Sequence, residues 1–356
     1  MTAALTFLGG LAGLLLAGHL VVRAASNIGA RFGLSPMVIG LTIVAAGTSA
    51  PELAVVSRSI AADDTELAVG SIIGSNIANV LLVLGLAAAF GTIHVSSRVV
   101  RIDIPVMIAA STLFLLFALD GVLGRLDSLI LFTGLLVLVA WTLRAADRSE
   151  HLVESVEVDA ETETLPPMGR SSVELIVGIA GLALAAGFVV DGASRLATSL
   201  GIPELIVGLT VVAIGTSAPE IVTTVIAALQ GRRDLAVGNA VGSNIFNILL
   251  VLGASGIFAP DGIIVSDDAL RLDLPVLLAA AFACLPIVAW DNKLDRWEGA
   301  VFVSYYVAYV IFLVLDGTGH RAKDPFALIM LGFVMPLTVI TAATIIHRQR
   351  RVPAAT

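Results

Sequence analysis

Two glutamates end identical six-residue strings, and these strings carry the clearest chemistry in the sequence. GTSAPE occupies residues 47–52 and again 215–220, so Glu52 and Glu220 hold equivalent positions. Residues three and four positions apart share one face of a helix, so the hydroxyl and carboxyl groups of each string can face one ligand. Carboxylate and hydroxyl oxygens suit hard cations such as Ca²⁺ and Na⁺. The hydroxyls belong to Thr48, Ser49, Thr216 and Ser217.

A glycine and a proline in each string predict a break in the helix. Pro51 has no N–H, so the carbonyl of Gly47 loses its helical hydrogen bond. We therefore expect free carbonyl oxygens in the turn around Ala45–Gly47 and in the equivalent turn at Ala213 of the second string, facing an ion, water or a cavity. A packing kink would explain the glycine and proline alone. The adjoining hydroxyl and carboxyl groups favour an ion site.

Further polar groups recur about 25 residues after each glutamate. Ser75 and Asn79 are spaced i,i+4, as are Ser243 and Asn247, so both pairs can face the glutamates. Beside them, Gly70–Gly74 and Gly238–Gly242 are GxxxG pairs that permit close helix contact. For two further amides, interhelical hydrogen bonding and ion ligation remain equally open; these are Asn76 and Asn244.

The elements that must position these groups are membrane helices. The chain has 356 residues, of which 58% are hydrophobic and 13% charged, with a mean hydropathy of +0.99. This composition argues against a soluble enzyme, and apolar runs of about 20 residues predict spans. One cysteine, Cys284, excludes an internal disulfide, and no basic patch suggests nucleic acid. Eleven spans are predicted, at 3–30, 36–61, 66–90, 99–119, 127–145, 173–198, 204–229, 234–258, 270–290, 297–315 and 325–347.

Both glutamates fall about midway along their predicted spans. A carboxylate at that depth costs about 3 kcal/mol on insertion scales. The alternative to a binding site is a protonated glutamate hydrogen-bonded to a neighbour. Because the same acid recurs in the same string, the sequence favours a site of two carboxylates. With no clustered histidine or cysteine, all candidate ligands are oxygen atoms and amides.

The chain contains an internal repeat at an offset of 168 residues. Twelve of twenty positions are identical between residues 33–52 and 201–220, and fourteen of twenty between 66–85 and 234–253. Five spans in each copy is an odd number, so the second copy enters the membrane from the opposite face. We predict an all-α polytopic membrane protein of two inverted five-helix repeats, ten core helices, and one extra C-terminal helix. The expected divisions are 1–145, an acidic linker 146–172, 173–315, and 316–356 with a basic tail.

The distribution of lysine and arginine predicts the orientation. With the N-terminus outside, 13 of these cations fall on the inner side and 6 on the outer side. Inner loops carry the excess of positive charge in membrane proteins. We expect a multi-pass plasma-membrane protein with the acidic linker and the C-terminus in the cytoplasm.

The repeated strings resemble a known family. GLTIVAAGTSAPEL and GLTVVAIGTSAPEI, followed by GSNIAN and GSNIFN, are similar to the two α-repeats of prokaryotic sodium/calcium exchangers, in the cation/calcium exchanger superfamily. The resemblance covers about residues 1–315. It implies a secondary antiporter without a prosthetic group that binds Ca²⁺ and Na⁺ alternately on the two glutamates. The implied ligands also include the threonine and serine hydroxyls, the carbonyls of Ala45 and Ala213, and Asn79 and Asn247.

Two features depart from the family pattern. Several relatives carry aspartate at the position of Asn247, so this chain has one carboxylate fewer there, which argues against potassium co-transport. The family core has ten helices, and the eleventh span is additional.

Other functions remain open at the level of sequence. Protons could replace Na⁺ on the same glutamates, which would make a Ca²⁺/H⁺ antiporter. An intramembrane aspartyl protease needs catalytic aspartates, whereas both acids are glutamates, and a passive channel would need no counter-ion. The expected partners are Ca²⁺, Na⁺ and the lipid bilayer, with no nucleic acid and no obligatory protein partner.

Overall fold

The computed structural model describes residues 2–150, 166–201, 213–284, 293–331 and 339, and this part of the chain is almost entirely helical. Eight of the predicted spans are long and apolar enough to cross a membrane, which confirms the all-α polytopic fold. They cover Thr2–Arg31, Pro36–Ala61, Thr65–Ala89, Val99–Ala118, Arg125–Thr142, Met168–Ser199, Arg233–Phe258 and Arg296–Gly317.

The other three predicted spans are described only in part. The seventh contains α11 (Ala213–Thr216) and α12 (Ala218–Leu229), the ninth η6 (Ala269–Asp273) and α15 (Leu274–Ala283), and the eleventh α18 (Lys323–Ile329). Their remaining residues fall in 202–212, 285–292, 332–338 and 340–356, outside the described residues.

Several spans are built from short helical pieces that change pitch. The second contains α2 (Pro36–Ile39), the π-helix η1 (Gly40–Val44), α3 (Ala45–Thr48) and α4 (Ala50–Ala61). The third contains α5 (Thr65–Ala78), η2 (Asn79–Leu84) and α6 (Gly85–Ala89). The eighth contains α13 (Arg233–Phe246), η5 (Asn247–Leu252) and α14 (Gly253–Phe258). The fourth contains η3 (Val99–Asp103) and α7 (Ile104–Ala118).

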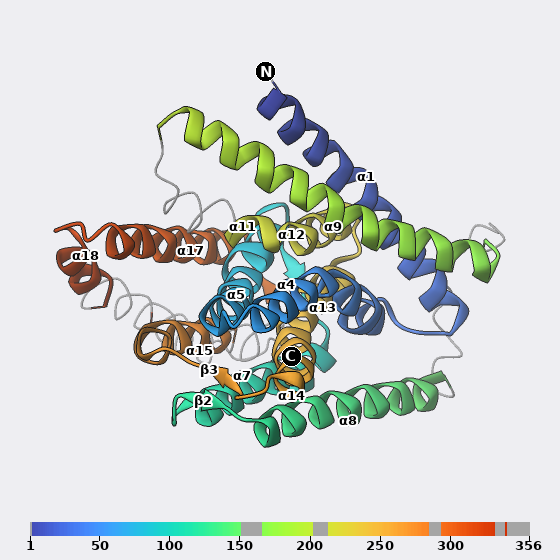
Figure 1. The fold of residues 1–356 in the computed structure, drawn as a ribbon. Coiled ribbons are helices and arrows are strands. Elements are labelled where there is room, and N and C mark those ends of the chain that lie inside the picture. The colour runs from blue at the N-terminus through green and yellow to red at the C-terminus, as the bar shows by residue number, and fades with distance from the viewer. Residues whose placement is uncertain (1, 151–165, 202–212, 285–292, 332–338, 340–356) are drawn as a thin grey trace, which may run out of the picture.

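Four single helices complete the bundle around these pieces (Figure 1). They are α1 (Thr2–Arg31), α8 (Arg125–Glu150), α9 (Met168–Ser199) and α17 (Arg296–Gly317). The helix α13 runs through the middle of the bundle, and nearly all of its residues are buried. The third span is the most buried in the first repeat, so the two equivalent spans form the core of the fold.

Two short antiparallel ribbons tie the repeats together. β1 (Ile93–His94) pairs with β4 (Lys293–Leu294), and β2 (Val122–Leu123) pairs with β3 (Ile263–Ile264). In each ribbon, the loop after the third span of one repeat meets the loop after the fourth span of the other. Successive loops lie at opposite ends of a helical bundle, so these pairings require the second repeat to be inverted.

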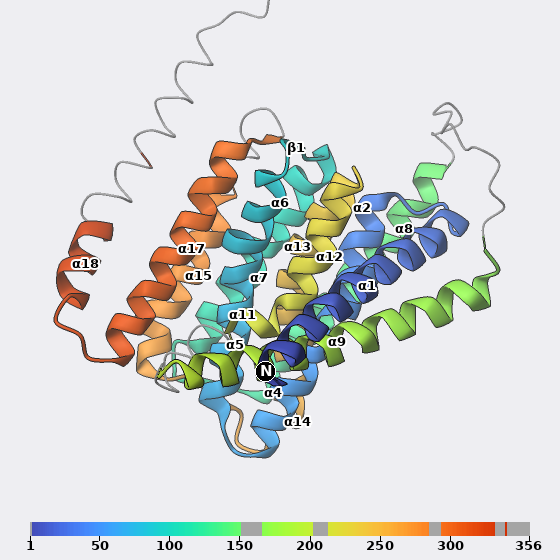
Figure 2. The same ribbon diagram turned by 90° about the horizontal axis from the view of Figure 1, so that it is seen from above.

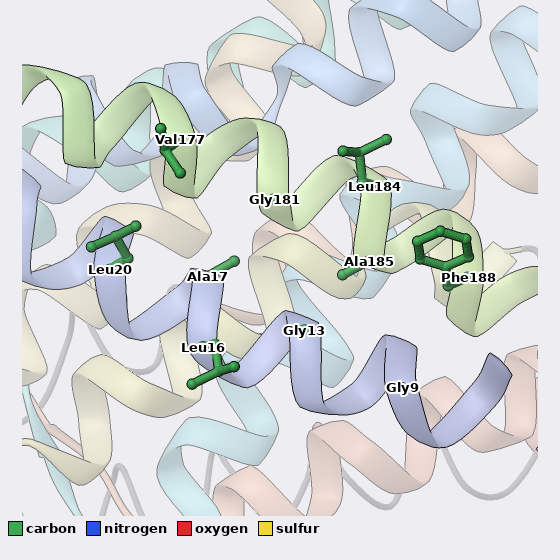
Figure 3. Close-up of a pocket in the computed structure, with 10 residues that line it drawn as sticks. All are labelled: Gly9, Gly13, Leu16, Ala17, Leu20, Val177, Gly181, Leu184, Ala185 and Phe188. Carbon is green, nitrogen blue, oxygen red and sulfur yellow. The ribbon is translucent and has the colours of Figure 1, made fainter. Parts of the chain in front are cut away.

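The helices α1 and α9 lie side by side across one face of the bundle (Figures 1 and 2). Glycines allow this contact: a Cβ added at Gly10 would lie 2.7 Å from the backbone nitrogen of Val189. Between the two helices is a groove of about 390 Å³. Figure 3 shows that only glycine, alanine and larger apolar residues line it. This lining provides no side-chain oxygen for a cation, so the groove is not the predicted ion site.

Helical structure reaches into both ends of the predicted acidic linker. α8 continues through Glu150, and α9 begins at Met168. The start of α9 is supported by an i,i+4 ion pair in which Arg170 Nε lies 2.7 Å from Glu174 Oε1. Residues 151–165, which hold most of the predicted linker, lie outside the described residues.

The described part of the eleventh span lies at the edge of the molecule. α18 packs against α17 and contains no buried residue (Figure 1). This agrees with the peripheral place expected from its lack of polar groups and of a partner in the repeat.

Candidate functional site

Both GTSAPE strings break their helices at the serine. α3 ends at Thr48 and α4 begins at Ala50, with Ser49 between them at φ −78° and ψ −2°. In the second string Ser217 takes the same place at φ −88° and ψ 7°. The proline then stands in the first turn of the new helix, where its missing N–H costs nothing. The break predicted from Gly47 and Pro51 is therefore present.

This break places each glutamate in the first turn of a half-helix. Glu52 lies near the N-terminus of α4, and Glu220 near the N-terminus of α12. The unpaired N–H groups of a helix N-terminus favour negative charge. Both carboxyl groups are buried, at 1% and 0% exposure, and Ser75 contacts both Glu52 and Ser217, which stands three residues before Glu220. The fold thus brings together the two acids that the sequence places 168 residues apart.

Hydroxyl contacts across the repeats close the site around these carboxyl groups. Ser75 Oγ lies 3.0 Å from Ser217 Oγ and donates to Glu52 Oε1 at 3.5 Å. On the other side, Thr48 Oγ1 lies 3.2 Å from Ser243 Oγ. The Ser75–Ser217 and Thr48–Ser243 contacts each join the GTSAPE string of one repeat to the third helix of the other, whereas the Ser75–Glu52 contact lies within the first repeat. Ser75 therefore contacts Glu52, and Ser243 contacts the Thr48 hydroxyl of the other repeat.

Close packing of α13 brings Ser243 to this place. A Cβ added at Gly238 would lie 2.7 Å from the carbonyl of Met37, and one at Gly242 would lie 2.8 Å from that of Leu41. The prediction that this GxxxG pair permits close helix contact is confirmed. For the equivalent pair in α5, the residues expected to face it belong to 202–212, outside the described residues.

The centre of the site holds several buried polar atoms without a hydrogen-bond partner among the described residues. They belong to both carboxyl groups, to one hydroxyl and to two amides. A buried polar atom without a partner costs about 1–3 kcal/mol. Such a cost is offset when the atoms bind an ion that enters the site. The atoms are Glu52 Oε2, Glu220 Oε1 and Oε2, Ser49 Oγ, and the amide N and O of Asn79 and Asn247.

A local change of helix type accompanies the two amides. The π-helices η2 and η5 begin at Asn79 and Asn247 and cover matching sequences, NVLLVL and NILLVL. A π-helical turn widens the backbone and is frequent at functional sites. Both amides are buried. The i,i+4 spacing identified the asparagines, but no sequence signal indicated the π-helices.

The structure changes the interpretation of the carbonyl groups. The carbonyl of Ala45 accepts the backbone N–H of Ser49 at 2.9 Å and lies 3.3 Å from Thr48 Oγ1. The expectation of a free carbonyl at Ala45 is therefore wrong, because the helix continues to hydrogen-bond up to Ser49. Only the remaining bonding capacity of that oxygen is available to an ion. In the second string, Ala213 begins α11 and Thr216 is half-buried.

The neighbouring asparagines make contacts of the interhelical kind. Asn76 Nδ2 donates to the carbonyl of Asn244 at 3.4 Å, and Asn244 Nδ2 lies 3.3 Å from Met107 Sδ. These contacts favour the interhelical reading for both amide nitrogens, while the two Oδ1 atoms are buried without a partner among the described residues.

The charge of the site is low for a metal centre. Within the described ranges, no three residues among histidine, cysteine, aspartate and glutamate come together as a metal cluster. The two glutamates supply two negative charges, and the other candidate ligands are neutral oxygens and amides. Two charges neutralise one Ca²⁺ or two Na⁺. Such a donor set suits a cation that binds and leaves.

Known proteins share this architecture. The family described as sodium/calcium exchanger protein matches residues 2–144 and 171–315. The putative antiporter CaxA of Alkalimonas amylolytica is 37% identical over 88% of this chain and 99% of the relative. The sodium/calcium exchanger MaX1 of Methanosarcina acetivorans is 32% identical over 82% of this chain and 93% of the relative.

A solved structure gives the same result for the fold. The sodium-calcium exchanger NCX_Mj, soaked with Na⁺ and Ca²⁺, superposes with a TM-score of 0.74 at 27% sequence identity. The match covers 87% of this chain and 98% of that structure.

Proposed function

The chain belongs to the sodium/calcium exchanger protein family, a family of cation transporters and not of enzymes, and we propose that it exchanges Na⁺ for Ca²⁺ across the membrane. The proposed site consists of Glu52 and Glu220 with their surrounding hydroxyls, carbonyls and amides. The observation that carries the proposal is the convergence of both carboxyl groups with buried polar atoms that have no partner among the described residues.

The exchange follows from sharing these ligands. Ca²⁺ and Na⁺ are both hard cations, so both compete for the same carboxylate oxygens. The charge of the site is balanced either by one Ca²⁺ or by Na⁺ ions, but not by both at once. Movement of Ca²⁺ in one direction is therefore coupled to movement of Na⁺ in the other. In inverted-repeat transporters the site lies near the midplane between the repeats, and access alternates by movement of one part against the other. In support of such an interface, α4 packs against η5 of the second repeat, and α12 packs against η2 of the first.

Calcium uptake into proteoliposomes tests the proposal. Purified protein is reconstituted in vesicles loaded with Na⁺ and diluted into Na⁺-free medium containing ⁴⁵Ca²⁺, with equal pH on both sides. We expect uptake that requires the Na⁺ gradient and is lost when internal Na⁺ is replaced by choline. Uptake that persists with choline inside would contradict the proposal.

A Ca²⁺/H⁺ antiporter is the alternative. Two buried carboxyl groups can also carry protons, and the antiporter CaxA is named without a counter-ion. A pH gradient imposed on the same vesicles without Na⁺ separates the two functions. Uptake driven by protons in the absence of Na⁺ would favour the alternative.

We also propose that the protein lies in the plasma membrane with its N-terminus outside and its linker and C-terminus in the cytoplasm. The sole cysteine, Cys284, is buried, so single cysteines can be introduced without background labelling. Exposed Ala62, in the loop between the second and third spans, should react with an impermeant maleimide on intact cells when replaced by cysteine. Ser155→Cys should react only after permeabilisation. The reverse pattern would contradict this orientation.

A further inference from the structure

Next to the site lies a buried amide that its spacing in the sequence did not single out. Asn239 stands one helical turn before Ser243 on α13 and is fully buried. Its Oδ1 lies 3.4 Å from Thr48 Oγ1, and its Nδ2 donates to Thr223 Oγ1 at 3.0 Å and to Thr224 Oγ1 at 2.8 Å. The side chain therefore connects the half-helix α12 of the second repeat to the GTSAPE string of the first.

The hydrogen bonds of Thr223 fix which end of the amide faces Thr48. The Thr223 hydroxyl donates to the carbonyl of Pro219 at 2.7 Å, with the carbonyl of Glu220 at 3.2 Å as a second acceptor. Its only proton is thus committed to the helix, and its oxygen can only accept from Asn239. A flipped amide would place two acceptors against each other. The carbonyl end of Asn239 consequently faces Thr48.

This orientation matters for how Thr48 can bind a cation. A hydroxyl has one proton and two lone pairs, and a cation must meet a lone pair. The proton therefore needs an acceptor that lies away from the ion. If the Thr48 hydroxyl donates its proton to Asn239 Oδ1, it does not need to donate to the carbonyl of Ala45. That carbonyl oxygen is itself a candidate ligand and then stays available to the ion.

The first repeat has no such arrangement. At the same offset of 168, Val55 and Val56 replace the two threonines, and Ser71 replaces Asn239. Valine cannot accept a hydrogen bond. The hydroxyl of Ser71 is buried and makes no hydrogen bond to any residue that the structure describes. The amide bridge thus belongs to one repeat only, although the strings it serves are identical.

We propose that Asn239 is a positioning residue that holds the Thr48 hydroxyl with its oxygen toward the transported cation. Thr223 and Thr224 set the orientation of Asn239, and the residue acts on the ion only through Thr48. This inference rests on the proposed exchange of Ca²⁺ at the two glutamates.

The test is a double-mutant cycle between Asn239→Ser, which introduces the residue of the first repeat, and Thr48→Ala. Two quantities are measured for each protein: the half-saturating Ca²⁺ concentration for transport, and the rise in Tm that Ca²⁺ produces in purified protein. Partners that orient metal ligands change affinity by about tenfold or more when removed. We expect Asn239→Ser to raise the half-saturating Ca²⁺ concentration by about that factor, with a smaller change in the maximal rate. In the Thr48→Ala background, Asn239→Ser should have no further effect.

Two other variants keep the proposal falsifiable if Asn239→Ser folds poorly. Thr224→Val removes one of the two acceptors of the amide and should give a smaller change in the same direction. Asn244→Ser is the matched control, because Asn244 is a buried amide on the same helix whose Nδ2 contacts Met107 Sδ. We expect it to lower Tm without changing the half-saturating Ca²⁺ concentration.

Several results would overturn the role of Asn239. These are independent, additive effects of Asn239→Ser and Thr48→Ala, or an unchanged half-saturating Ca²⁺ concentration in both Asn239→Ser and Thr224→Val. A wild-type protein that takes up Ca²⁺ without Na⁺ would contradict the proposed counter-ion instead. In that case the Ca²⁺-dependent rise in Tm would still decide the role of Asn239.

Discussion

The two half-helices that carry the glutamates begin with the same residues and lie in different surroundings. In α12, Ala218 and Pro219 are buried, and a Cβ added at Gly18 of α1 would meet the side chains of Val222 and Ile226. In α4, Ala50 is exposed and Pro51 is half-buried. The helix α1 therefore packs against the second half-helix, while the first remains more open at its equivalent surface.

The sequences after the glutamates follow this difference. α12 continues as IVTTVIAAL, which is apolar except for the two buried threonines that contact Asn239. α4 continues as LAVVSRSIA, with Ser57 and Arg58 exposed. Identical motifs thus supply the ligands, and the flanking residues make the halves unequal. In a transporter with inverted repeats, a difference between the halves in one state is what alternating access requires.

The largest expected effect on transport comes from the two glutamates, and it tests whether both repeats contribute equally to the charge of the ion site. Glu52→Gln and Glu220→Gln should each abolish calcium transport in a folded protein, since each leaves Ca²⁺ half-neutralised. Removing one partner of a buried charge pair costs about 3–5 kcal/mol, which is a factor of about a hundred or more in affinity. ⁴⁵Ca²⁺ uptake measures it, with Glu66→Gln on the exposed start of α5 as control. Normal exchange in either variant would remove that glutamate from the site.

The amides at the start of the π-helices are the next test of symmetry. Asn79→Ala and Asn247→Ala should each raise the half-saturating Ca²⁺ concentration about ten- to a hundredfold, because a neutral group bound to a charge contributes about 1.5–3 kcal/mol. Asn76→Ala is the control, since Asn76 bonds to the carbonyl of Asn244. Equal effects at Asn79 and Asn247 would indicate a symmetric ion site. An effect at only one of the two positions would show that the two repeats differ in their ion ligands as well as in the surroundings of their half-helices.

Glycine-to-alanine changes at helix contacts should have a smaller effect, and they test the packing of the helices by its effect on Tm. Gly242→Ala places a Cβ 2.8 Å from both the carbonyl of Leu41 and the Cβ of Ala45, so α13 must shift. Overpacking of this kind costs about 1–3 kcal/mol, and Tm should fall. Gly187→Ala on α9 meets no atom of the described residues within 4 Å, so there the higher helix propensity of alanine should raise Tm slightly. Equal stability of the two variants would contradict the close contact at Gly242. Gly74→Ala should match Gly242→Ala if the first repeat packs in the same way.

Much of the fold could be predicted because its determinants are periodic or repeated. Apolar runs give the spans, and the odd number of spans per repeat gives the inversion, which the β1–β4 and β2–β3 pairings support. The two glutamates and the serines at residues 75 and 243 were found because identical strings recur at one offset. Their burial and mutual contacts agree with that interpretation.

The features that escaped prediction depend on tertiary contacts. No local pattern distinguishes a π-helix at Asn79 from an α-helix, because both place the same residues in a continuous helix. Asn239 has no counterpart in the first repeat, so a search for repeated residues passes over it. Free carbonyls are expected around Ala45–Gly47 because Pro51 removes the donor of Gly47, but the carbonyl of Ala45 keeps its ordinary helical partner, the backbone N–H of Ser49.

The smallest effect on transport is expected at the part of the chain outside both repeats. The described part of the eleventh span packs on α17, with Lys323 paired to Asp316 and lying 5.9 Å from the ring of Phe312. It offers no buried polar group to the ion site. Truncation after Lys323 should therefore lower the yield or Tm of the purified protein, since one packing face of α17 loses its cover.

Exchange itself should survive the truncation. The half-saturating Ca²⁺ concentration should stay within about twofold of the full chain, the range expected for changes remote from a site. Vesicle uptake normalised to the amount of inserted protein measures the half-saturating Ca²⁺ concentration. The truncated chain keeps Lys323 and Asp316, so the full chain with Lys323→Met tests the contribution of that ion pair separately. A truncated protein that is folded and correctly inserted but does not transport would show that the eleventh helix takes part in the mechanism. Transport would then depend on the eleventh helix in addition to the two repeats.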